Sequence, residues 1–207
     1  MALNNNYSTN IGAIVLAAGE SSRLGTPKQL LKYAGQSLLQ HSAEAATASG
    51  AHPVVVVLGA NADIIKKEIE NNKIHVVVNT EWREGMASSI RYGIKTLLEL
   101  NPLAEGIILV LCDQPHVTPA LLTNLIMKYR ETGKSIVASQ YRNTFGPPVF
   151  FHKTMFSKLL LLKGDVGAKG IISQHTSEME IISFPKGNID IDTEADYQNL
   201  SKDSRDS

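Results

Sequence analysis

Residues 11–28 read IGAIVLAAGESSRLGTPK, an apolar run that passes directly into a loop rich in glycine, serine and basic side chains. The apolar part, Ile11–Ala18, has the length and composition of a strand that is buried on both faces of a parallel sheet. The loop has backbone freedom at Gly19 and Gly25 and small side chains at several other positions. Its successive N–H groups can therefore surround an anion.

Two cations in this loop add charge to the predicted anion site. Arg23 can form a planar fork on phosphate oxygens, and Lys28 is a compact charge suited to a triphosphate. The spacing matches neither a Walker A loop nor the GxGxxG pattern. We therefore expect a magnesium nucleoside triphosphate to bind residues 17–28. The alternative is a flexible surface turn that happens to carry two cations.

The remainder of the chain alternates between strand-like and helix-like patterns. Further apolar runs of strand length are found at Val54–Leu58, Ile74–Val78, Ile107–Leu111 and Ile136–Ala138. Helical patterns are found at Ser37–Ser49, Asn61–Asn71, Met86–Leu98, Leu121–Tyr129 and Thr154–Leu162. This alternation predicts a three-layer α/β fold, in which a mostly parallel, twisted sheet has helices on both faces. We expect a single domain over residues 11–200, with flexible termini at 1–10 and 201–207.

Composition excludes several classes of protein. The 207 residues are 43% hydrophobic, which is enough for a sizeable core. Lysine and arginine number 20, as do aspartate and glutamate, so the net charge of zero argues against a nucleic-acid-binding protein. No apolar run approaches the ~20 residues that cross a bilayer, and no secretory signal is visible. The single Cys112 cannot form an internal disulfide. The sequence therefore predicts a cytoplasmic protein that binds neither nucleic acid nor membrane.

A carboxylate follows the apolar run Ile107–Leu111. In open α/β sheets, ligands bind outside the carboxyl ends of the strands, and Asp113 is predicted to lie at such an end. Its hard oxygens suit Mg²⁺, which typically keeps one or two protein carboxylates, waters and substrate phosphates. The alternative is an Asp that caps the turn before Thr118-Pro119, where a helix is expected to begin. Cys112 is expected to be a small buried hydrophobe rather than a nucleophile.

Two other segments carry polar groups of interest. Asp190 and Asp192 share one side of an extended segment, because residues i and i+2 share a face. Asp192 or Thr193 could instead cap a helix over Glu194–Leu200. In the NTEWREGMASSI segment, Ser89 and its neighbour lie in the first turn of a helix, where hydroxyl and N–H groups can meet ribose or phosphate. Helix capping is again the alternative.

The segment LAAGESSRLGTPKQLL resembles the signature LAAGxSxRxGxxK of the MobA-like nucleotidyltransferases. The resemblance is strongest to their molybdenum cofactor cytidylyltransferase branch, because Ala18 stands where the guanylyltransferase branch usually has Gly. It continues through NTEWREGMASSI, LCDQP, FGPPVFF, KGDVGAKG and DIDTEADY, and so covers about residues 11–200. The resemblance implies the Rossmann-like nucleotidyltransferase fold.

The resemblance also implies a reaction. A Mg²⁺-dependent enzyme would move CMP from CTP to the phosphate of molybdopterin or the molybdenum cofactor and release diphosphate. The implied partners are CTP or another nucleoside triphosphate, a phosphorylated pterin, and an apo-molybdoenzyme that receives the product. Two alternatives remain open. One is a nucleotidyltransferase that uses GTP or acts on a sugar or polyol phosphate, and the other is a non-catalytic protein that binds and delivers the cofactor.

Residue roles follow from the matching motifs. The expected catalytic residues are Arg23, Lys28 and Asp113. The expected nucleotide-binding residues are Leu16, Ala17, Ala18, Gly19, Ser22, Arg23, Gly25, Lys28, Gly59, Ser89 and Asp113. The expected metal ligands are Asp113 and Asp192, with Asp190 as the less certain neighbour. On the acceptor side the resemblance places Gly146, Pro147, Gly164, Asp165, Gly167 and Lys169. Lys169 departs from the usual Arg, so a charge remains there but the bidentate fork is lost.

Overall fold

Strand β1 (Ile11–Ala17) is buried along its whole length, and its alternate residues face two hydrophobic cores. A strand with two apolar faces is stable only inside a sheet that is covered on both sides. Accordingly β1 pairs in parallel with β4 (Val54–Leu58) on one side and with β6 (Gly106–Leu111) on the other. The computed structural model describes residues 10–69 and 73–203.

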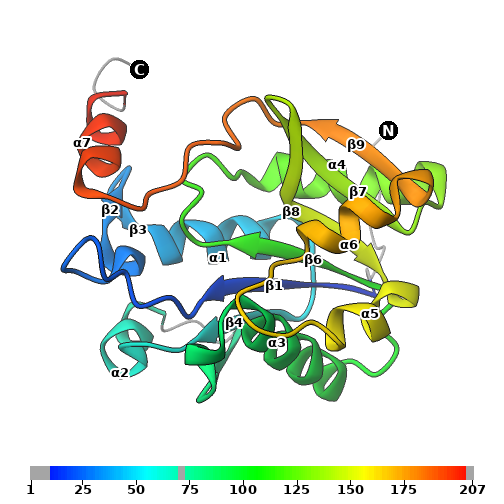
Figure 1. The fold of residues 1–207 in the computed structure, drawn as a ribbon, viewed down its shortest axis with the longest axis horizontal. Coiled ribbons are helices and arrows are strands. Elements are labelled where there is room, and N and C mark those ends of the chain that lie inside the picture. Colours follow the sequence, from blue (N-terminus) through cyan, green and yellow to red (C-terminus); the bar gives the residue numbers. More distant parts are fainter. Residues whose placement is uncertain (1–9, 70–72, 204–207) are drawn as a thin grey trace, which may run out of the picture.

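The sheet has seven strands in the order β5-β4-β1-β6-β8-β7-β9 (Figure 1). The remaining strands are β5 (Ile74–Val78), β7 (Ile136–Tyr141), β8 (Thr144–His152) and β9 (Met179–Ser183). Only β8 runs antiparallel to its neighbours β6 and β7. The predicted mostly parallel sheet is therefore confirmed. A two-stranded hairpin, β2 (Lys32–Tyr33) and β3 (Gln36–Ser37), lies outside it.

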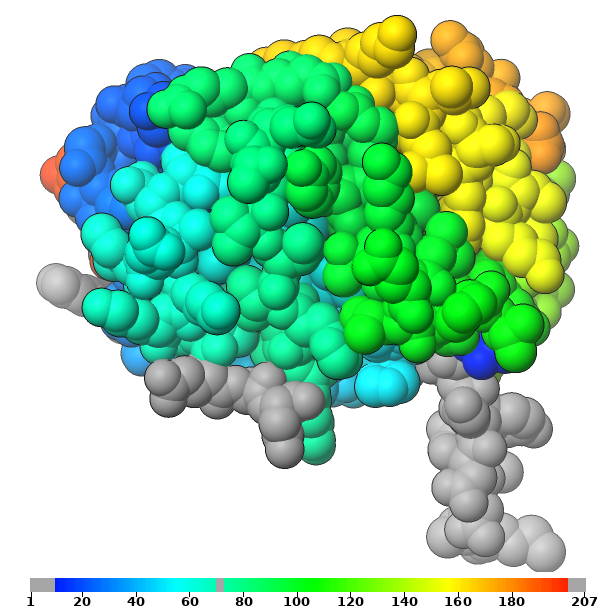
Figure 2. Space-filling model, turned by 90° about the horizontal axis from the view of Figure 1, so that it is seen from below, coloured from blue at the N-terminus to red at the C-terminus, as the bar shows by residue number. Residues whose placement is uncertain are grey.

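Helices cover both faces of this sheet, which confirms the three layers. Helices α1 (Leu38–Ala48) and α4 (Pro119–Thr132) pack on one face. On the other face lie α3 (Met86–Leu100), α5 (Phe156–Leu160) and α6 (Lys169–Gln174). Figure 2 shows α3 in green beside the yellow segment that contains α5. The remaining helices are α2 (Ala62–Ile65), α7 (Glu194–Asp203), and the 3-10 helices Lys28–Leu30, Lys66–Glu68, Trp82–Glu84, Lys153–Met155 and Thr176–Glu178.

Local sequence signals explain where the main helices begin. Ser37 and Gln40 form a reciprocal capping box at the start of α1. The Thr118 hydroxyl accepts a hydrogen bond from Leu121 N, and Pro119 occupies the first position of α4. The predicted start of this helix is thus confirmed. No helix in the described part of the chain is long and apolar enough to span a membrane.

Several segments differ from the pattern-based prediction. The helix expected over Asn61–Asn71 is shorter, because α2 ends at Ile65 and gives way to a 3-10 turn; residues 70–72 lie outside the described chain. Strands β8 and β9 and helix α6 had no predicted counterpart. At the termini, α7 continues to Asp203, whereas residues 1–9 and 204–207, which were expected to be flexible, lie outside the described residues.

The topology places two loops together. Leu16 of β1 is paired with Leu111 of β6, so these parallel strands end side by side. The glycine-rich loop and the Cys112-Asp113 segment therefore leave the sheet at the same edge. This is the edge at which open α/β sheets bind their ligands.

Candidate active site

A buried amide shapes the beginning of the glycine-rich loop. Gln29 is fully buried, and its Nε2 donates to Ala17 O and to Gly19 O, at 2.9 Å in each case. The backbone N–H of Lys28 donates to the Ser21 hydroxyl at 3.0 Å. These bonds fold the loop back toward the end of β1. The sequence motifs did not indicate a role for Gln29, because its hydrogen bond reaches Ala17 O, twelve residues earlier in the chain.

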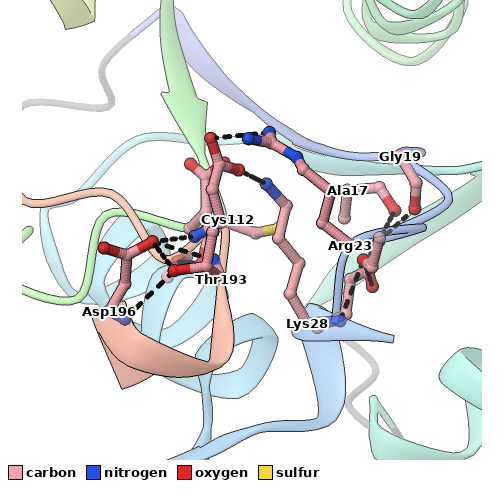
Figure 3. A network of polar contacts seen from close by, with 12 residues as sticks. Ala17, Gly19, Arg23, Lys28, Cys112, Thr193 and Asp196 are labelled. Atoms are coloured by element: carbon pink, nitrogen blue, oxygen red, sulfur yellow. Dashed lines mark hydrogen bonds and ion pairs between the residues drawn. The ribbon is translucent and has the colours of Figure 1, made fainter. Parts of the chain in front are cut away.

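Lys28 lies between two carboxylates from distant parts of the chain. Its Nζ donates to Asp113 Oδ2 at 2.6 Å and to Asp192 Oδ1 at 2.9 Å (Figure 3). Arg23 NH2 lies 3.1 Å from Asp192 Oδ2. Burial opposes the charge on Lys28, but the two carboxylates outweigh it and raise the lysine pKa above its ordinary value. The structure thus brings together four of the residues selected from the sequence.

The two carboxylate oxygens of Asp113 have different surroundings. Oδ2 contacts Lys28, whereas Oδ1 is buried and has no hydrogen-bond partner among the residues that the structure describes. Neither oxygen therefore caps the following turn, and α4 is capped by the Thr118 hydroxyl instead. A buried, unpartnered carboxylate oxygen is costly unless a ligand satisfies it. The geometry therefore favours the ligand-binding interpretation of Asp113 over the turn-capping one.

The N-terminus of α7 is capped by residues other than Asp192. Asp196 Oδ2 accepts hydrogen bonds from the backbone N–H of Thr193 at 2.8 Å and from its hydroxyl at 2.7 Å. The Thr193 hydroxyl in turn accepts from Asp196 N at 3.2 Å. Thr193 and Asp196 thus form the reciprocal cap (Figure 3). The carboxylate of Asp192 is left to face Lys28 and Arg23.

Removing this cap is expected to weaken the folded protein by a modest amount. Asp196→Ala leaves the backbone N–H groups of Asp192 and Thr193 without their acceptor, which typically costs about 1 kcal/mol. Urea denaturation measures the difference in the free energy of unfolding. The neighbouring Gln198→Ala, at an exposed position of α7, is the control. Equal stability of the two variants would contradict the cap.

Asp190 lies close enough to Asp113 and Asp192 to feel their charges. Burial, together with the charges of Asp113 and Asp192, raises the pKa of its carboxyl to about 6. The pKa of Asp192, in contrast, is lowered by its hydrogen bond from Lys28, although burial opposes this effect. Three carboxylates therefore share a region that Lys28 only partly neutralises. Such a region attracts cations.

The donor set fits a divalent ion that the substrate helps to bind. Within residues 10–69 and 73–203, no group of three or more His, Cys, Asp or Glu side chains is placed to hold a metal alone. Asp113 and Asp192 converge on one point, and Asp113 Oδ1 is available. Mg²⁺ commonly takes one or two carboxylates and completes its shell with phosphate oxygens and water.

A cavity of about 600 Å³ opens beside these groups. Its volume lies in the range of small-molecule sites. Eight residues selected from the sequence line it: Leu16, Ala17, Ala18, Gly19, Lys28, Ser89, Asp113 and Asp165. Cys112 also lines it, and burial raises the pKa of its thiol to about 12, so it is no thiolate at neutral pH. The remaining lining residues are Glu20, Gln29, Trp82, Arg83, Glu84, Gly85, Met86 and Leu111.

The other predicted residues lie around this cavity without lining it. Ser22, Arg23 and Gly25 belong to the outer part of the loop, where Gly25 has a positive φ of 66°. Gly59 lies behind the wall: a Cβ there would be 2.7 Å from Trp82 Cβ and 2.8 Å from Ala18 Cβ. Its lack of a side chain lets these two wall residues come together.

Buried hydrogen bonds order the first turn of α3. Asn79 Nδ2 donates to the hydroxyls of Ser88 at 2.8 Å and Ser89 at 3.0 Å. Ser88 also donates to Glu81 O and Gly85 O, so its role is structural. Ser89 is 4% exposed and faces the cavity. Asn79 was missed at the level of sequence, since a single Asn after a strand carries no distinctive signal.

Residues assigned to the acceptor side separate into two groups. Asp165 lines the cavity, and Gly164 O accepts a hydrogen bond from Ala87 N at 3.2 Å. Gly167 approaches Met86. Gly146 and Pro147 lie on β8, beside Tyr141 and Gln114 respectively, and Lys169 begins α6. Only the segment around Gly164 therefore reaches the cavity wall.

Comparison with known protein families identifies the family of this chain. Residues 13–179, which include the loop, Lys28 and Asp113, match the family described as "MobA-like NTP transferase domain". The protein is a MobA-like NTP transferase. The resemblance to the MobA-like nucleotidyltransferases is thus confirmed for residues 13–179, and the enzyme class is that of the nucleotidyltransferases.

Relatives of this MobA-like transferase match different shares of it. Nicotine blue oxidoreductase of Paenarthrobacter nicotinovorans is 36% identical over 58% of the chain and 57% of its own length. The purine catabolism protein PucB of Bacillus subtilis is 29% identical over 77% of the chain and 78% of its own. The chain thus spans little more than half of the first relative, whose name describes a different reaction.

Solved structures match nearly the whole of the MobA-like transferase. Rv0371c from Mycobacterium tuberculosis H37Rv is 33% identical, with a TM-score of 0.80 over 94% of this chain and 99% of its own. A second structure of that protein is a complex with manganese, at 29% identity and a TM-score of 0.77. A divalent metal is therefore bound by a member of the family.

Proposed function

We propose that the protein transfers CMP from CTP to the phosphate of molybdopterin or of the molybdenum cofactor. An acceptor phosphate oxygen attacks the α-phosphorus of CTP, the bond from that phosphorus to the bridging oxygen breaks, and diphosphate leaves. The observation that carries this proposal is Lys28, held between Asp113 and Asp192 at the mouth of the cavity. In this arrangement the lysine can bind the negatively charged phosphates, and the two carboxylates can bind a metal cation.

The positively and negatively charged residues of the site would have different roles. Lys28 and Arg23 would turn from the carboxylates to the triphosphate, and Arg23, whose side chain is 67% exposed, has room to do so. Asp113 and Asp192 would hold Mg²⁺ together with phosphate oxygens. When bound, this ion neutralises charge on the phosphates and orients them for in-line attack. The nucleophile belongs to the acceptor, so catalysis is mainly positioning and electrostatic stabilisation.

The two substrates would contact different parts of the cavity lining. The β1 loop, Leu16–Gly19, and Ser89 supply one wall for the nucleotide. Asp165 and the adjoining Gly85 supply a wall on the side to which the resemblance assigns the pterin. Gly146, Pro147 and Lys169 stand further from the cavity, where they could contact only an extended acceptor.

An assay of diphosphate release tests the proposal directly. The full-length protein is incubated with Mg²⁺ and each nucleoside triphosphate in turn, with and without molybdopterin. Release that requires both CTP and molybdopterin supports the proposed reaction. Release that requires a sugar or polyol phosphate instead would assign a different acceptor. Binding of the cofactor without any diphosphate release would indicate a delivery protein.

The preference for CTP over GTP is expected to depend on Ala18. Its methyl group lies in the cavity wall and is packed close to Gly59, so it narrows the space for a purine. Such a pocket discriminates by about 1–3 kcal/mol, or roughly 10–200-fold in kcat/KM. Ala18→Gly should reduce the discrimination, whereas Ala138→Gly, in β7 and away from the cavity, should not.

The measurement compares kcat/KM for CTP and GTP with the same acceptor in all three proteins. Equal use of both nucleotides by the wild type would contradict the cytidylyl assignment. Unchanged discrimination in Ala18→Gly would remove Ala18 from the determinants of specificity.

A further inference from the structure

Glu84 and Arg91 form a bidentate ion pair next to the cavity. Arg91 NH2 lies 2.6 Å from Glu84 Oε2, and NH1 lies 2.9 Å from Oε1. Two parallel contacts of this kind fix the orientation of both side chains. Glu84 ends the Trp82–Glu84 turn in the cavity wall, and Arg91 lies in α3. The pair therefore ties this wall to the helix behind it.

The same two side chains also bind the backbone of a distant segment. Arg91 NH1 donates to Leu162 O at 2.7 Å, and Glu84 Oε1 accepts from Gly164 N at 3.2 Å. The arginine and glutamate thus hold a carbonyl and an amide that are 71 and 80 residues away in sequence, respectively. The side chain of Arg91 is only 16% exposed, and its bond to Leu162 O is partly buried. We call residues 162–165 the wall turn.

The wall turn is in close contact with the start of α3. A Cβ on Gly85 would lie 2.5 Å from Asp165 Cα and 2.7 Å from Gly164 C, and the φ of Gly85 is 115°. Ala87 N donates to Gly164 O at 3.2 Å, whereas Met86 N reaches Asp165 Oδ1 only at 3.4 Å. The bond to the Asp165 side chain is long. The position of this carboxylate in the cavity therefore depends on the backbone around it.

We propose that Glu84 and Arg91 are positioning residues that hold the wall turn, and with it Asp165, against the cavity for the second substrate. Asp165 is a carboxylate, so it would accept hydrogen bonds from N–H or O–H groups of the acceptor. This inference rests on the proposed function for the identity of that substrate. The pair itself reaches the substrate only through the turn that it holds.

Kinetic constants distinguish positioning from simple structural support. Arg91→Met keeps an apolar stem of similar length but removes all the donors. It should raise KM for the acceptor about tenfold or more, since displacement by about 1 Å can cost up to 100-fold, with kcat and KM for CTP changed by less than about threefold. Arg91→Lys retains the charge without the fork and should give an intermediate KM. Lys128→Met, which removes an exposed ion pair in α4, is the matched control.

Amide hydrogen exchange tests the same inference without turnover. In Arg91→Met and in Glu84→Ala, exchange at Gly164 and Ala87 should be faster by about tenfold or more, while β1 and β6 exchange as in the wild type. If diphosphate release fails but this local change occurs, the proposed reaction is wrong, and the ion pair still holds the wall turn in place. Unchanged exchange at Gly164, or an acceptor KM that changes no more than in Lys128→Met, would overturn the inference.

Discussion

Asp113→Asn should lower kcat/KM for nucleotidyl transfer by about 3–5 kcal/mol, or roughly two to four orders of magnitude. The amide keeps the shape of the side chain but loses the charge that would hold Mg²⁺ against the phosphates. The fold should persist, because the backbone oxygen of Asp113 still accepts from Ile191 N at 3.0 Å. Steady-state assays of diphosphate release at saturating Mg²⁺ measure the loss.

Two further variants test whether the loss of activity in Asp113→Asn comes from a lost metal ligand. Asp192→Asn should also reduce turnover if two carboxylates bind the ion, whereas full activity would leave Asp113 as the single protein ligand. Asp63→Asn, at an exposed position in α2, controls for the removal of a carboxylate and should behave as the wild type. Normal turnover in Asp113→Asn would contradict the metal site altogether.

Lys28→Met is expected to have the second largest effect, and it should act on both binding and folding. Loss of a charge-assisted contact should weaken triphosphate binding by about 1.5–3 kcal/mol, as measured by titration calorimetry. Removal of the cation also leaves Asp113 and Asp192 facing each other. The metal-free protein should therefore be less stable by about 1–3 kcal/mol. This is less than for a wholly buried pair, because the Asp192 side chain is 42% exposed.

A double variant separates these two effects of Lys28. Lys28→Met combined with Asp113→Asn should regain stability toward urea, since one of the opposed charges is gone, but it should not regain affinity for CTP. Lys128→Met should change neither quantity by more than about 0.5 kcal/mol. Unchanged CTP affinity in Lys28→Met would remove this residue from the proposed triphosphate site.

Much of the sheet was predictable because its signals are local. Val54–Leu58 and Ile74–Val78 form strands with the predicted boundaries, since short runs of β-branched residues favour a pleated strand. β4 is buried throughout, whereas β5 is an edge strand that is only partly buried. β8 had no such signal. It contains Gly146, Pro147 and Pro148, which ordinarily argue against a strand. It forms because β6 and β7 pair with it on both sides, with a register shift after Ala138.

The candidate site was predictable to the extent that motifs specify residue types. The loop from Leu16 to Lys28 and the strand end at Asp113 could be located because charged groups follow buried strands. The resemblance added Asp192, yet the sequence left its role open between ligand and helix cap. Tertiary structure resolved the capping question, because Asp196 lies where it completes the cap with Thr193.

The sequence by itself determined the class of fold and the chemical character of the loop, because strand periodicity, glycine freedom and charge are properties of neighbouring residues. Only the tertiary structure determined which groups meet. Lys28 and Asp192 are 164 residues apart, and the Glu84 side chain bonds the amide of Gly164 eighty residues on. Such pairs exist only in the folded protein, where β1 and β6 lie side by side and α3 packs on the sheet, because a hydrogen bond requires contact in space and not nearness along the chain.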